Sequence, residues 1–124
     1  MTELPEGYEL NKKLVRIVEN RRKSINEEKN IDWSTAEHLA FGTLLDEGHP
    51  VRLSGQDSCR GTFSQRHAVF VDQNNENRYV PLNNLKENQP QFEVIDSPLS
   101  EASVLGFEYG YSLTEPSALV MWEA

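Results

Sequence analysis

The amino-acid sequence predicts an α/β domain, with a partial parallel sheet of about three strands flanked by helices. Segments of helical periodicity alternate with short apolar segments at 51–53, 92–95 and 118–122, and a helical pattern at 101–113 joins the last two. Strands joined through a helix run parallel, because the helix carries the chain back to the edge where the previous strand began. A parallel sheet needs cover on both faces, and the sequence stops after its third strand, so we expect a truncated domain.

The first helix is expected from Asn11 onward. Leu14, Val18 and Ile25 fall near one face, Asn11 is a suitable N-cap, and the polar run 26–30 ends the pattern. The few apolar residues predict weak packing of this helix.

The second helix has clearer boundaries. Asp32 or Ser34 can cap its start, and Ser34 with Glu37 fits a capping box. Gly48 follows as a C-cap, and Pro50 prevents continuation. We expect one apolar stripe to face the core, made of Trp33, Ala36, Leu39, Ala40, Leu44 and Leu45.

The third helix carries the main candidate for chemistry. Ser100 can cap it, and Glu101 lies in its first turn, where a carboxylate either complements the helix dipole or reaches a docked group. Phe107 and Tyr109 either pack in the core or line a site. Glycines at 106 and 110 share one face and allow close approach of another helix.

Composition excludes several classes of function. The chain has 124 residues, 37% of them hydrophobic, and a net charge of −8, which argues against binding of nucleic acid. No apolar run approaches the roughly 20 residues that span a membrane, so we expect a soluble protein of the cytoplasm or an organelle matrix. One cysteine and three scattered histidines give no ligand spacing, so no metal site is expected in this chain.

The loop 54–67 is dense in polar side chains, including Arg66 and His67. A loop after a strand's carboxyl end is where open α/β sheets bind ligands. No spacing marks a Ser-His-Asp triad, and no motif surrounds Cys59 as a nucleophile.

Several longer motifs occur along nearly the whole chain: EGHPVRLSGQD at 47–57, RGTFS at 60–64, RHA at 66–68, YVPL at 79–82, LSE at 99–101, GFEYGY at 106–111 and ALVMWEA at 118–124. In sequence and in order, these motifs resemble one family, the thiamine-diphosphate-dependent decarboxylating subunit of 2-oxoglutarate dehydrogenase. Gln65 departs from the histidine frequent in the family, which puts a proton-transfer role for this loop in doubt.

The resemblance implies a fold and a domain division. It indicates the transketolase-like pyrimidine-binding domain, with an N-terminal tail and connecting helix at 1–31 and the N-terminal part of the α/β domain at 32–124. The implied activity, a step of the tricarboxylic acid cycle, is oxidative decarboxylation of 2-oxoglutarate with transfer of the succinyl group to a lipoyl carrier. A related 2-keto acid enzyme, such as 2-oxoadipate dehydrogenase, and a free-standing non-catalytic binding module are the alternatives.

The resemblance also implies site residues, cofactors and partners. Glu101 matches the glutamate that hydrogen-bonds the aminopyrimidine of thiamine diphosphate, Phe107 or Tyr109 would pack near that ring, and Arg66 and His67 would belong to the active-site loop. The Gly-Asp-Gly motif for Mg²⁺ and the diphosphate does not occur, so another domain would bind Mg²⁺ and the chain alone would be inactive. Implied partners are the rest of the subunit, the second subunit of a homodimer and the lipoyl-bearing succinyltransferase, in bacterial cytoplasm or mitochondrial matrix.

Overall fold

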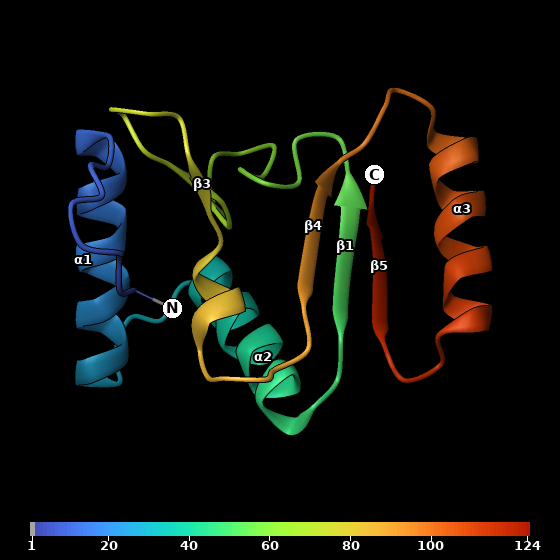
Figure 1. Cartoon of the computed structure of the whole chain (residues 1–124), viewed down its shortest axis with the longest axis horizontal. Helices are drawn as coiled ribbons and strands as arrows, with labels where there is room; N and C mark the ends of the chain where they lie inside the picture. The colour runs from blue at the N-terminus through green and yellow to red at the C-terminus, as the bar shows by residue number, and fades with distance from the viewer. Residues whose placement is uncertain (1) are drawn as a thin grey trace.

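The computed structural model describes residues 2–124 and has the α/β architecture that the sequence predicts. A 3-10 turn, Pro81–Asn84, adds to the regular elements (Figure 1), which are α1 (Lys12–Glu27), α2 (Trp33–Glu47), β1 (Val51–Gly55), β2 (Phe70–Val71), β3 (Arg78–Tyr79), β4 (Phe92–Asp96), α3 (Glu101–Thr114) and β5 (Leu119–Glu123).

The main sheet has three strands in the order β4-β1-β5, and both pairs are parallel. This confirms the predicted three-stranded parallel sheet. The strands end at one edge, and α3 begins at that same edge after the chain leaves β4 (Figure 1). The register places Arg52 of the central strand between Glu93 of β4 and Val120 of β5.

One face of the sheet carries the hydrophobic core. Side chains alternate between the two faces of a strand, so Val51 and Leu53 point to one side and Arg52 to the other. Helix α2 covers the apolar side. The buried cluster there consists of Phe41, Leu45, Val51, Leu53, Ala68, Leu82 and Phe92.

The expected buried stripe of α2 is wrong for most of its members. Trp33 is 84% exposed and Leu39 is exposed, whereas the buried residues are Ser34, Thr35, His38, Phe41 and Leu45. The apolar residues of this helix surround its axis, so periodicity did not select a face. The buried face is polar at its start because two arginines from elsewhere in the chain lie against it, as shown below.

The capping box is also wrong. Asp32 is the N-cap and accepts a hydrogen bond of 2.7 Å from the backbone N–H of Thr35. Ser34 Oγ instead accepts a hydrogen bond from Arg21, and Glu37 pairs with Arg66. Gly48 ends the helix in the left-handed conformation, as predicted.

Helix α1 packs on a second, smaller core. Asn11 caps its start as predicted, and Val18 joins Leu10 and Phe70 in a separate buried cluster. Phe70 belongs to a two-stranded antiparallel hairpin of β2 and β3, on the side of the main sheet away from α3 (Figure 1). This hairpin was not predicted, because two-residue strands are too short to show alternation. Within residues 2–124, no helix is long and apolar enough to cross a membrane.

Candidate functional site

Glu101 lies at the carboxyl edge of the sheet, in the first turn of α3, and its side chain is exposed. It lines a narrow groove between the start of α3 and the end of β5, which has no room for a water molecule, together with Gln56, Ser97, Pro98, Trp122 and Glu123. This edge is where open α/β sheets bind ligands. The structure therefore places Glu101 at the surface of this edge.

The first turn of α3 keeps its backbone donors free of a side-chain cap. Ser100 occupies the N-cap position, as predicted, but its Oγ donates to Ser103 Oγ at 2.9 Å rather than accepting from the backbone. Unsatisfied N–H groups at a helix start favour negative charge and polar ligand atoms. Glu101 is thus held beside free donors at an open edge of the sheet.

Phe107 and Tyr109 lie on different sides of α3. At 100° per residue they are about 160° apart around the helix axis, and they are 61% and 66% exposed. Phe107 lines a cavity of about 220 Å³, together with Ile95 and Val104. This cavity lies between α3 and the face of the sheet opposite the hydrophobic core. The two rings therefore cannot pack together against the same pyrimidine ring. At most one of them can line a given site.

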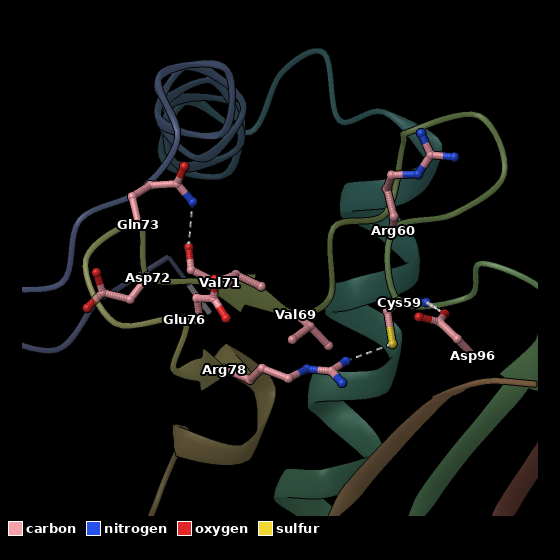
Figure 2. Close-up of a pocket in the computed structure, with 9 residues that line it drawn as sticks. All are labelled: Cys59, Arg60, Val69, Val71, Asp72, Gln73, Glu76, Arg78 and Asp96. Atoms are coloured by element: carbon pink, nitrogen blue, oxygen red, sulfur yellow. Dashed lines mark hydrogen bonds between the residues drawn. The ribbon is translucent and has the colours of Figure 1, made fainter.

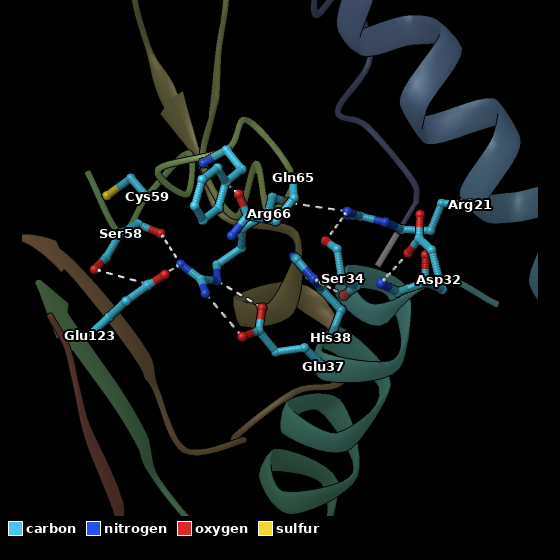
Figure 3. A network of polar contacts seen from close by, with 12 residues as sticks. Arg21, Asp32, Ser34, Glu37, His38, Ser58, Cys59, Gln65, Arg66 and Glu123 are labelled. Atoms are coloured by element: carbon cyan, nitrogen blue, oxygen red, sulfur yellow. Dashed lines mark hydrogen bonds and ion pairs between the residues drawn. The ribbon is translucent and has the colours of Figure 1, made fainter. Parts of the chain in front are cut away.

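Arg66 of the loop 54–67 is buried, and its guanidinium donates its hydrogen bonds to other groups of the protein (Figure 3). Its Nε and Nη2 donate to Glu37 at 2.7 and 3.0 Å, and its Nη1 donates to Glu123 at 2.5 Å and to the carbonyl of Ser58 at 2.9 Å. Burial by itself would lower the pKa of Arg66, but the hydrogen bonds with Glu37 and Glu123 raise it above its ordinary value. Arg66 therefore joins α2 to the end of β5.

A second buried arginine extends this network to α1. Arg21 Nη2 donates to Ser34 Oγ and to the carbonyl of Arg66, both at 3.0 Å (Figure 3). His38 lies in the same region, where its Nδ1 is 2.8 Å from the carbonyl oxygen of Ser34. Burial, together with the positive charge of Arg21, lowers the pKa of His38 to about 4.

His67 sits in a left-handed backbone conformation, with φ of 47°, at the end of the polar loop. Its Nε2 is 2.8 Å from the carbonyl oxygen of Ser64, and burial lowers its pKa. Neither Arg66 nor His67 is among the residues, within 2–124, that line the groove at Glu101. The structure does not bring these two candidates together with Glu101 in one groove.

A cavity of about 590 Å³ lies between the polar loop and the hairpin (Figure 2). Arg78 donates to Cys59 Sγ at 3.4 Å, and Asp96 accepts a hydrogen bond of 2.8 Å from the backbone N–H of Cys59. Burial and the nearby Asp96 raise the pKa of the Cys59 thiol, which disfavours the reactive thiolate. Within residues 2–124, no group of three His, Cys, Asp or Glu side chains could hold a metal ion.

The ion pair of Arg52 and Glu108 is the feature of this region that sequence reasoning missed. Arg52 Nε and Nη2 donate to the two carboxylate oxygens of Glu108 at 2.7 and 2.9 Å, and Nη1 donates to Glu93. One signal was present: a charged residue between Val51 and Leu53, in an otherwise apolar strand, needs a buried partner.

Comparison with known proteins identifies the fold family. Residues 29–124 match the family described as "Transketolase, pyrimidine binding domain". The chain belongs to this family. The pyrimidine-binding domain is thus an α/β domain here, and the Glu101 groove lies inside the matched region.

Curated relatives of this pyrimidine-binding domain are much longer proteins. The chain is 56% identical, over all its 124 residues, to the 2-oxoglutarate dehydrogenase E1 component of Brucella ovis. It is 63% identical over 121 residues, 98% of the chain, to the mitochondrial 2-oxoglutarate dehydrogenase of Schizosaccharomyces pombe. In both cases the chain spans 12% of the length of the relative.

Proposed function

We propose that this chain is the pyrimidine-binding segment of a thiamine-diphosphate-dependent oxidoreductase that acts on 2-oxoglutarate. The observation that carries this proposal is 56–63% identity, over nearly the whole chain, to proteins named 2-oxoglutarate dehydrogenase. The reaction would be oxidative decarboxylation of 2-oxoglutarate with transfer of the succinyl group to a lipoyl carrier. In the proposed division, residues 1–31 form the tail and connecting helix and 32–124 the N-terminal part of the α/β domain.

Glu101 is the residue through which this chain would act on the cofactor. Its exposed carboxylate, at the carboxyl edge of the sheet, fits a hydrogen bond with a ring nitrogen of the aminopyrimidine. Glu101 would hold a proton at that nitrogen and so control the protonation of the aminopyrimidine. Bound thiamine diphosphate supplies the electron sink for loss of CO₂ from the 2-oxo acid.

The other proposed site residues have less direct roles. Phe107 or Tyr109, on opposite flanks of α3, would pack near the pyrimidine ring. Arg66 would hold the active-site loop in place rather than contact a ligand, because its guanidinium is hydrogen-bonded to Glu37 and Glu123. His67 would stay neutral near pH 7, because burial lowers its pKa.

In this proposal, the chain binds only the pyrimidine end of the cofactor. No group of three potential metal-ligating side chains occurs in the described part of the chain, residues 2–124. We propose, from the missing Gly-Asp-Gly motif, that another domain binds Mg²⁺ and the diphosphate, and we expect the isolated chain to be inactive. The proposed partners are the remainder of the subunit, a second subunit of a homodimer and a lipoyl-bearing succinyltransferase, in bacterial cytoplasm or the mitochondrial matrix.

The test is Glu101→Gln in the full-length enzyme. The amide keeps the size of the side chain but loses the carboxylate that controls the proton. We expect decarboxylation of 2-oxoglutarate to fall about 10²- to 10⁴-fold, the usual worth of a positioned acid or base. Glu87→Gln, a change at an exposed residue outside the groove, is the matched control.

Two outcomes would contradict the proposal. Near-normal turnover of Glu101→Gln would remove Glu101 from the proton control. Preference of the unaltered enzyme for 2-oxoadipate over 2-oxoglutarate, measured in parallel, would replace the proposed substrate.

A further inference from the structure

Helix α3 is attached to the sheet in an unusual way. Of its 14 residues, all of them described by the structure, Glu108 is the only buried one. Several of its large apolar side chains are exposed: Leu105 by 47%, Phe107 by 61%, Tyr109 by 66% and Leu113 by 66%. A helix of this kind normally buries an apolar stripe. Here a carboxylate takes the central position on the buried face.

The partner of Glu108 is the central strand of the sheet. The Arg52 side chain is 11% exposed and the Glu108 side chain 5%, and the two form a bidentate pair. The Arg52 guanidinium also lies 5.4 Å from the ring centre of Phe107 and 4.6 Å from that of Tyr111. Two parallel N–H···O bonds fix direction as well as distance, which apolar contact does not.

Glu101 lies on the same face of α3 as Glu108. The two are seven residues apart, so they differ by only about 20° around the axis and are separated by about 10 Å along it. Val104, between them, lies on this face and is half-buried. A rotation of α3 that broke the pair at Glu108 would therefore swing Glu101 through the same angle.

Resting on the proposed function of Glu101, we propose that the Arg52–Glu108 ion pair is a positioning device that sets the rotation of α3 and thereby aims the Glu101 carboxylate. Arg52 and Glu108 do not line the groove at Glu101, although both line the neighbouring cavity with Phe107; they act on Glu101 through the helix. Glu93 of the neighbouring strand β4 forms a further ion pair with Arg52 and restrains the guanidinium from that side.

The decisive variant removes the pair without leaving a buried charge. In Arg52→Met/Glu108→Leu, apolar side chains of similar volume replace both partners, a change that is often neutral or stabilising for the fold. Apolar contact between the two new side chains keeps α3 on the sheet. The two directional hydrogen bonds of the ion pair are lost, so the helix is no longer held at one rotation about its axis. The single variant Glu108→Gln, which keeps the shape of the side chain, gives an independent second measurement.

Two readouts in the full-length enzyme separate positioning from stability. The first is kcat and KM for 2-oxoglutarate, measured on folded enzyme. The second is the rate at which bound thiamine diphosphate exchanges its thiazolium proton for deuterium, which needs no 2-oxo acid. We expect kcat and the exchange rate of the double variant to fall about 10²-fold, the cost of a displacement of about 1 Å, with KM little changed and the melting temperature retained. Glu87→Gln serves as the control.

The outcomes distinguish this inference from the function on which it rests. If Glu101→Gln abolishes proton exchange and the double variant exchanges at the unaltered rate, the pair only holds the fold and the positioning role is refuted. If Glu101→Gln itself exchanges normally, the proposed function fails first. A double variant that loses exchange while keeping its melting temperature establishes the positioning role.

Discussion

Replacing His38 should remove a large part of the acid sensitivity of this fold. His38 is 3% exposed, and this burial, together with the positive charges of Arg21 and Arg66, lowers its pKa from 6.5 to about 4. The unfolded chain binds a proton at His38 near pH 6.5, whereas the folded chain resists protonation until about pH 4. The stability from His38 is therefore fully present above pH 6.5 and is lost as the pH falls from 6.5 towards 4.

The size of this effect follows from the shift. Lowering the pKa of His38 from 6.5 to about 4 amounts to roughly 3 kcal/mol of stability, of which about 2 kcal/mol is lost between pH 8 and pH 5. In His38→Gln, which cannot bind a proton, this portion should be missing from the pH dependence of the free energy of unfolding. The other titrating groups remain, so the informative quantity is the difference between the profiles of the two proteins.

Urea unfolding of the chain at several pH values between 8 and 4.5 measures this difference. His49→Gln, which removes a histidine from an exposed position, is the matched control. Titration of the imidazole protons by NMR provides a direct check, with His38 expected near pH 4. A His38 pKa close to 6.5, or parallel unfolding profiles for the unaltered chain and His38→Gln, would refute the reasoning.

Two further substitutions test the packing around the candidate site. Gly55→Ala should destabilise the fold by about 1–3 kcal/mol, because an added Cβ at the end of β1 would collide with the backbone carbonyl of Glu123; thermal unfolding checks this, and an unchanged melting temperature would contradict the close approach. Arg66→Met should cost about 3–5 kcal/mol in urea unfolding, since it leaves the carboxylates of Glu37 and Glu123 facing each other without their shared cation. A loss below about 1 kcal/mol would show that these carboxylates find solvent instead.

Much of the fold follows from local sequence signals. Asn11 and Gly48 mark helix ends, Pro50 precedes the first strand, and the apolar runs near Phe92 and Leu119 became β4 and β5. Such signals act within a few residues, so they can be read without knowing the fold. The hairpin of β2 and β3 was missed because each strand has only two residues.

The candidate site divides in the same way. The position of Glu101 in the first turn of a helix follows from Ser100 and the helical pattern after it, and the structure places it at an open edge of the sheet. The interior location of Arg66 could not be predicted, because its partners Glu37 and Glu123 lie 29 and 57 residues away along the chain. A polar loop gives no signal about which of its side chains turn inward.

The fold class, the longer helices and strands and the family could be predicted from the sequence, because caps, periodicity and motifs are properties of neighbouring residues. The tertiary structure alone decided which face of α2 is buried and how α3 is held. Arg52 and Glu108 are 56 residues apart, and the packing of α3 beside β1 brings them within hydrogen-bond distance. A buried charge is stable only with its partner in place, so the folded arrangement, and not the local pattern, determines how Glu101 is aimed.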